Sequence, residues 1–74
     1  MINEYLINMT WDSDAAVWTA TSENVPGLVL ESGSFDALVE RVRFAVPELL
    51  ALNGTPGQTL SLCLRSERRE QVSV

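Results

Sequence analysis

Residues 28–52 read LVLESGSFDALVERVRFAVPELLAL, and the spacing of their apolar side chains changes at Phe35. Residues 28–31 are a short, mainly apolar run, so we expect a well-buried strand there. From Phe35 onward the apolar residues recur every three or four positions, which predicts an amphipathic helix. Ser34 is the expected N-cap, because its hydroxyl can accept a free N–H of the first turn, and Asp36 suits the positive end of the helix dipole.

The expected helix ends at Asn53-Gly54, where either residue can take the left-handed conformation that ends a helix. Pro47 lies inside it, and a proline there removes one backbone hydrogen bond and clashes with a preceding carbonyl, at a cost of about 3 kcal/mol. Two interpretations stay open: one helix kinked before Pro47, or a second helix with Pro47 in its first turn. The apolar stripe comprises Phe35, Leu38, Val39, Val42, Ala45, Val46, Leu49, Leu50 and Leu52.

Before this region, apolar and polar side chains alternate over residues 2–11, which predicts a half-buried strand. Residues 12–15 are turn formers and residues 16–21 resume a β-rich pattern, so the two segments predict a β-hairpin. Val25-Pro26-Gly27 fits a type II turn, in which the glycine supplies the positive φ. On the first strand one face carries Tyr5, Ile7, Met9 and Trp11, and the other carries Glu4, Leu6, Asn8 and Thr10.

After the loop at Thr55-Pro56-Gly57, residues 59–65 alternate again and predict a last strand. Residues 66–74 either prolong that strand or turn back as a fifth. On the strand, Leu60, Leu62 and Leu64 point one way, and Ser61, Cys63 and Arg65 point the other.

The predicted order is therefore β-β-β-α-β, an α+β fold in which one helix covers one face of an antiparallel sheet. Residues 1–74 leave no room for a second core, so we expect a single domain. Folds this small usually need a disulfide, a metal or a partner chain. Cys63 is the only cysteine and histidine is absent, so we expect a homodimer.

Composition excludes most chemistry. Without histidine or lysine there is no Ser-His or Cys-His nucleophile, no Schiff base and no P-loop lysine, so we expect no enzyme and no cofactor. Ten Asp and Glu against five Arg give a net charge of −5, the wrong sign for nucleic acid and suited to a basic partner. Neither a membrane span nor a signal peptide is recognisable, which predicts a cytoplasmic protein.

Two groups of residues have competing interpretations. Asp12 and Asp14 with Glu31 resemble a carboxylate cluster for a divalent metal, but aspartates in a hairpin loop are usual turn formers, so we expect no metal site. Trp11 and Trp18 offer an aromatic platform for a partner, but flanking a short loop they are better explained as a cross-strand pair that supports the sheet.

A longer pattern comprises residues 11–18, WDSDAAVW, residues 21–28, TSENVPGL, then Glu31, Leu38 and residues 46–50, VPELL, with Asn53. This pattern resembles a family of short proteins of unknown function in the HicB-like antitoxin superfamily. The resemblance implies a partial ribonuclease-H-like fold. Larger HicB proteins use this module to block HicA, a small basic RNA-cleaving toxin, and carry a C-terminal DNA-binding unit. Ala16 replaces the family's hairpin glycine.

The resemblance and the acidic charge together predict a non-catalytic protein-binding module that belongs to a toxin–antitoxin system. The short sequence after the last strand predicts that no C-terminal DNA-binding domain is present. The alternative is a self-associating scaffold or regulatory protein without a toxin partner. The candidate partner-binding residues are Asp12, Asp14, Glu23 and Glu31, and the structural motif comprises Trp11, Trp18, Pro26, Gly27, Pro47 and Asn53.

Overall fold

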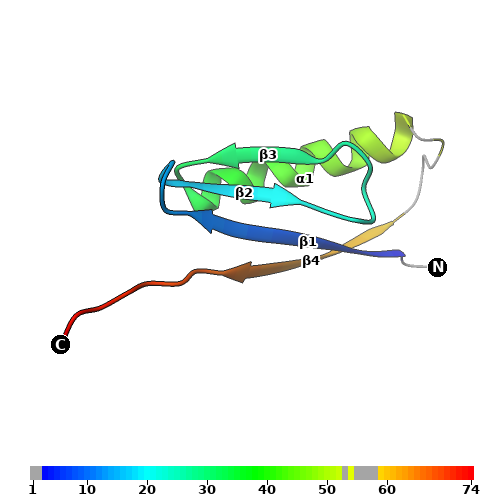
Figure 1. The fold of residues 1–74 in the computed structure, drawn as a ribbon. Coiled ribbons are helices and arrows are strands. Elements are labelled where there is room, and N and C mark those ends of the chain that lie inside the picture. The colour runs from blue at the N-terminus through cyan, green and yellow to red at the C-terminus, as the bar shows by residue number, and fades with distance from the viewer. Residues whose placement is uncertain (1–2, 53, 55–58) are drawn as a thin grey trace.

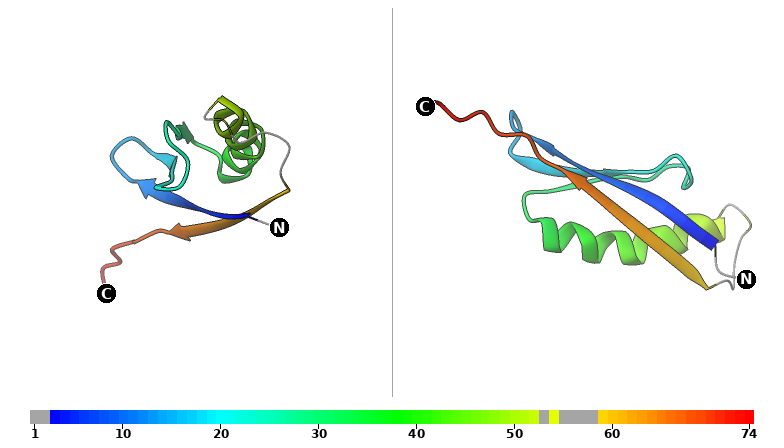
Figure 2. Two further views of the ribbon diagram at one scale, coloured as in Figure 1. Left: turned by 90° about the vertical axis from the view of Figure 1, so that its right-hand side faces the viewer. Right: turned by 90° about the horizontal axis from the view of Figure 1, so that it is seen from below.

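The structure is a computed structural model that describes residues 3–52, 54 and 59–74. The fold is α+β with the predicted order β-β-β-α-β, and the strands lie in the order β3-β2-β1-β4 (Figure 1). The single helix covers one face of the sheet (Figure 2). Within the described residues, no helix is long and apolar enough to cross a membrane. The elements are β1 (Asn3–Asp12), β2 (Val17–Thr21), β3 (Val29–Ser32), α1 (Phe35–Leu52) and β4 (Leu60–Glu67).

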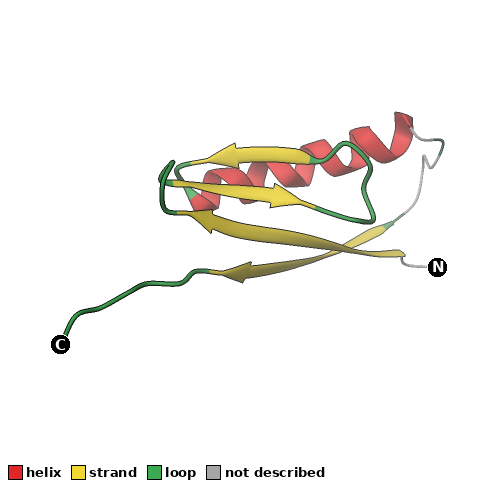
Figure 3. Ribbon diagram, viewed as in Figure 1, coloured by secondary structure: helices red, strands yellow, loops and turns green. Residues whose placement is uncertain are grey.

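The sheet is mixed, so the expected antiparallel arrangement holds for β1, β2 and β3 but not for β4. The strands β1 and β2 pair antiparallel, as do β2 and β3, whereas β1 and β4 pair in parallel with Ile7 opposite Leu64. The cause is the helical connection: β3 runs in the direction of β1, and α1 carries the chain back to the end where β3 began (Figure 3).

The core lies between α1 and the sheet face turned toward it, which we call the inner face. Four buried helix residues recur every four positions, as the stripe predicts. The strand residues Ile7, Met9 and Ala20 are buried beneath them, and Val25 and Leu28 close one side. The buried helix residues are Leu38, Val42, Val46 and Leu50.

The helix is one continuous element, and the two-helix interpretation of Pro47 is wrong. Pro47 and Arg43, whose carbonyl loses its usual donor, both lie on the exposed side of α1, where water can satisfy that carbonyl. At the N-terminus the predicted cap is confirmed, because the Ser34 hydroxyl accepts the N–H of Ala37 at 3.2 Å. Gly54 takes the predicted left-handed conformation with φ 85°.

Asn53 and the predicted loop at 55–58 lie outside the described residues. The turn at Val25-Pro26-Gly27 is confirmed, because the N–H of Leu28 bonds to the Val25 carbonyl at 3.2 Å and Gly27 has φ 86°.

The helix lies over β2 and β3, and this position corrects two expectations about burial, those for the third strand and for Leu52. The predicted third strand is not well buried: β3 is an edge strand whose residues alternate, and Val29 is 71% exposed on the face away from α1. The predicted common face of Leu60, Leu62 and Leu64 is confirmed as the inner face, where Leu64 lies beyond the helix and is 38% exposed. Leu52, in the last helical turn, is 83% exposed.

Candidate functional site

The sheet face away from α1, which we call the outer face, carries side chains in regular rows. Thr10 of β1 lies opposite Thr19 of β2 and Glu67 of β4, and Thr19 lies opposite Glu31 of β3. Because opposed residues point to the same face, these four form one row across the sheet. The next row comprises Val29, Thr21, Asn8 and Arg65.

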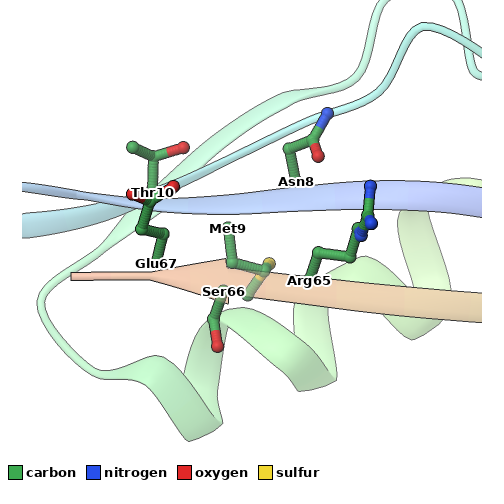
Figure 4. Close-up of a pocket in the computed structure, with 6 residues that line it drawn as sticks. All are labelled: Asn8, Met9, Thr10, Arg65, Ser66 and Glu67. Atoms are coloured by element: carbon green, nitrogen blue, oxygen red, sulfur yellow. The ribbon is translucent and has the colours of Figure 1, made fainter.

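A hollow follows the seam between β1 and β4 and is drawn in Figure 4. Asn8 and Arg65 point away from the helix, whereas Met9 and Ser66 point toward it. The outer side of the seam therefore offers an amide and a guanidinium, with the Thr10 hydroxyl beside them, for hydrogen bonds to a partner. The residues lining the hollow are Asn8, Met9, Thr10, Arg65, Ser66 and Glu67.

Just beyond the end of β2, the side chains of residues 22 and 24 hydrogen-bond to the backbone of β1, in place of the backbone-to-backbone hydrogen bonds between the two strands. The Ser22 hydroxyl donates to the Leu6 carbonyl at 2.6 Å, and the Leu6 N–H donates to Asn24 Oδ1 at 3.1 Å. These bonds satisfy both backbone groups of Leu6 where β2 has ended. They also hold the intervening Glu23 beside a second outer hollow, which Arg65 lines as well.

The hairpin loop is organised by Asp12. Its Oδ1 accepts the N–H groups of Asp14 at 3.0 Å and Ala15 at 3.2 Å, which is the turn-forming role predicted for the loop aspartates. Ala16 completes the loop with φ 56°, a left-handed conformation that explains why a glycine suits this position. Asp14 itself is exposed at the loop.

The two tryptophans are a cross-strand pair, as predicted. Trp11 lies opposite Trp18 with ring centroids 5.5 Å apart, and Trp18 contacts Phe35 edge-on at 4.9 Å. The guanidinium of Arg68 lies 4.1 Å from the centroid of Trp11. The tryptophans therefore join the sheet to the start of α1 and to the C-terminal tail.

The candidate partner-binding residues lie along one side of the molecule but do not converge. Asp12 and Glu31 belong to the outer face and are separated by the width of β2, Glu23 lies at the opposite end of that face, and Asp14 lies in the hairpin loop. Among the described residues, no group of three His, Cys, Asp or Glu side chains is placed to hold a metal ion.

The outer face is acidic. Among its described residues, five carboxylates accompany two guanidinium groups, those of Arg65 and Arg69. No ion pair within the described part of the chain engages Asp14, Glu23 or Glu31, whereas Glu67 pairs with Arg69 at 2.9 Å. A surface of this sign attracts a basic partner. The five carboxylates belong to Glu4, Asp12, Glu23, Glu31 and Glu67.

Sequence reasoning did not select several residues that shape this face. Arg65 and Asn8 lie side by side in the parallel pair of β1 and β4, and the sequence had predicted an antiparallel sheet. Ser22 and Asn24 flank Glu23 at a spacing of two, which was a usable sign that their side chains face the same way.

Residues 4–74 match the family model described as a domain of unknown function, DUF1902. The chain belongs to the DUF1902 family. No curated protein matches the DUF1902 chain at a significant level.

A solved structure similar to this DUF1902 domain is the crystal structure of hypothetical protein TTHA1013 from the extremely thermophilic bacterium Thermus thermophilus. The two chains are 32% identical with a TM-score of 0.81, and the match covers 95% of this chain and 100% of that one. The DUF1902 domain thus shares its fold with that hypothetical protein.

Proposed function

We propose that this domain is a non-catalytic protein-binding module whose outer face binds a small basic protein. The observation that carries the proposal is the charge of that face, where five carboxylates accompany two guanidinium groups and one of these, that of Arg69, is already paired with Glu67. Charge complementarity of this kind speeds association with a basic partner and selects against acidic ones.

The resemblance to the HicB-like superfamily supports a more specific partner. In that superfamily the equivalent module blocks a HicA-type toxin, a small basic protein that cleaves RNA. We therefore propose a HicA-like toxin as the partner and neutralisation by direct binding as the mechanism. This role would place the domain in the cytoplasm, where the unpaired Cys63 would remain reduced.

The proposed contacts differ among the candidate acids. Asp12 already uses one carboxylate oxygen to hold the hairpin loop, so its substitution would disturb the loop as well as the charge. Glu23 and Glu31 are exposed, and no described ion pair occupies their carboxylates, so they are the better probes of binding. Asp14 extends the acidic surface at the loop.

Co-expression with the product of an adjacent reading frame tests the proposal. The wild-type domain should rescue growth from a toxic neighbour and should co-purify with it, and Glu23→Gln with Glu31→Gln should weaken both effects. Glu40→Gln with Glu48→Gln removes the same charge from the exposed side of α1, so that control should rescue like the wild type. Equal loss in both variants would contradict binding by the outer face.

The absence of catalysis is part of the proposal and has its own test. Incubation of the domain with RNA and Mg²⁺ or Mn²⁺ should give no more cleavage than the Asp12→Asn, Asp14→Asn, Glu31→Gln variant gives. Cleavage that the triple variant abolishes would contradict a purely binding role. Recovery of the homo-oligomer alone from the native host, without rescue of any toxicity, would instead favour a self-associating scaffold or regulatory protein.

A further inference from the structure

The edge of the sheet at β4 presents unpaired backbone groups. Both backbone groups of Leu6 face β2, because they bond to Ser22 and Asn24. Backbone direction alternates along a strand, so the odd-numbered residues of β1 face β4. In a parallel pair each of them hydrogen-bonds to the two residues that flank its opposed residue, so the odd-numbered residues of β4 face β1. The N–H and C=O groups of the even-numbered residues of β4 therefore point outward from the sheet. These residues are Leu60, Leu62, Leu64 and Ser66.

The other edge of the sheet differs. The same alternation directs the Glu31 carbonyl of β3 outward, and Arg41 Nη1 donates to it at 2.8 Å. The β3 strand spans four residues and β4 spans eight. No hydrogen bond within the described residues occupies the outward groups of β4, so β4 is the longer and more open edge.

The side chains beside this open edge are apolar. Leu60 and Leu62 are only partly buried on the inner face, and Leu64 is 38% exposed because α1 lies over β2 and β3. A strand added at this edge would bring its own inner-face side chains against these leucines.

The C-terminal tail, residues 68–74, supplies a strand of the right pattern. It continues beyond β4 without turning back, extending away from the body of the protein (Figures 1 and 2). It keeps the alternation of β4, because Arg68 Nε bonds to Glu70 at 2.6 Å and Arg69 bonds to Glu67, both at a spacing of two. Arg68 lies over Trp11, an inner-face residue, so even-numbered tail residues belong to the inner side.

The two exposed valines of the tail, Val72 and Val74, are even-numbered like Arg68. Val72 is 83% exposed and Val74 is fully exposed. If the alternation of β4 is continued along the tail, both valines point to the inner side, as the leucines of β4 do.

We propose that a second copy of this chain pairs antiparallel with the β4 edge, so that each tail becomes a fifth strand on its partner. A two-fold axis perpendicular to the sheet keeps the inner faces of both copies on the same side. An even-numbered residue of one copy therefore lies opposite an even-numbered residue of the other, and an odd-numbered residue opposite an odd-numbered one. With Arg68 on the axis, Leu64 faces the partner's Val72 and Leu62 faces the partner's Val74. On the outer face, Glu67 then faces Arg69 of the partner subunit.

Neighbouring registers are less favourable. With the axis at Glu67, the two Glu67 carboxylates lie opposite each other and Arg65 lies opposite the partner's Arg69. Both contacts are unfavourable, because like charges directly opposite each other are destabilising. With the axis at Arg69, the two Arg69 side chains lie opposite each other, and no residue of the second copy's tail lies opposite Leu62. In the proposed register, the two Arg68 side chains are the only like charges directly opposite each other. Each Arg68 already contacts its own Trp11 and Glu70.

This pairing leaves the acidic outer face accessible, so it is independent of the proposed toxin binding. It also supplies the partner chain that a small domain without a disulfide would need.

Light scattering at micromolar concentration tests the interface in the full chain. The wild type should have the mass of a dimer, and Val72→Asp with Val74→Asp should have the mass of a monomer with an unchanged circular dichroism spectrum. Gln71→Asp with Ser73→Asp adds the same charge at the alternate positions and should remain dimeric. A monomeric wild type, or a dimeric Val72→Asp, Val74→Asp variant, would overturn the proposal.

A disulfide tests the register. In the proposed pairing Cys63 lies opposite the partner's Ser73 in a pair without mutual hydrogen bonds, where Cα atoms are about 4.5 Å apart and a disulfide can form. Oxidised Ser73→Cys should therefore run as a covalent dimer on a non-reducing gel, with the Cys63 linkage identified by peptide mass spectrometry. Gln71→Cys, two residues away, should not. Preferential crosslinking of Gln71→Cys, or none in Ser73→Cys, would overturn the register.

Discussion

Replacing Ala16 with glycine should stabilise the fold. Ala16 has φ 56°, and among the described residues it is the only one besides glycine with a positive φ. For an L-residue the left-handed conformation costs roughly 1–2 kcal/mol. Glycine removes that strain but gives the unfolded chain more freedom, which costs roughly 0.4–1 kcal/mol. The net gain in the free energy of unfolding should be about 0.5–1 kcal/mol.

Thermal unfolding followed by circular dichroism measures this gain. For a domain of this size about 1 kcal/mol raises the Tm by about 4–8 °C, so Ala16→Gly should unfold roughly 2–8 °C higher than the wild type. The two proteins must be compared at equal concentration, because association also raises the Tm.

The neighbouring residue provides the matched control. Ala15 lies in the same loop without a positive φ, so Ala15→Gly should lower the free energy of unfolding by about 0.4–1 kcal/mol. Opposite signs at adjacent alanines are the expected result. A Tm for Ala16→Gly equal to or below that of the wild type would refute the assignment of strain to this position.

Three further substitutions, one of them with a matched control, test the local arguments by urea unfolding. Pro47→Ala should raise the free energy of unfolding by about 1–2 kcal/mol, because it restores a helix hydrogen bond; a loss would show that the helix depends on the proline. Gly27→Ala should lower it by about 1–2 kcal/mol because of the positive φ, whereas Gly33→Ala should change it by less than about 0.5 kcal/mol; equal effects would contradict this. Asn24→Ala should cost about 1 kcal/mol by leaving the Leu6 N–H unpaired, and an unchanged stability would indicate that water replaces the amide.

Local patterns predicted the elements of this fold well, because their causes lie within a few residues. Ser34 caps the helix through its own hydroxyl, and the hairpin sets Trp11 opposite Trp18. Pro47 could not be resolved from the sequence, because its tolerance depends on which side of the helix faces water.

The arrangement of the elements was less predictable. The parallel direction of β4 depends on the helical connection, and the exposure of Val29 and Leu64 depends on which strands the helix covers. The acids of the candidate site were chosen by charge alone. The placement of Asp12 and Glu31 on one face follows from the strand register, which also brings Arg65 and Asn8 beside each other.

Binding of a basic partner by the outer face is the central claim, and the dissociation constant tests it most directly. The partner recovered by co-expression would be titrated with the wild type, with Glu23→Gln, Glu31→Gln, and with the helix control Glu40→Gln, Glu48→Gln. Loss of two exposed charges, each worth up to about 1 kcal/mol, should weaken binding by up to about 30-fold, mainly through slower and less salt-dependent association. The helix control should bind like the wild type. An unchanged dissociation constant for Glu23→Gln, Glu31→Gln would contradict the account.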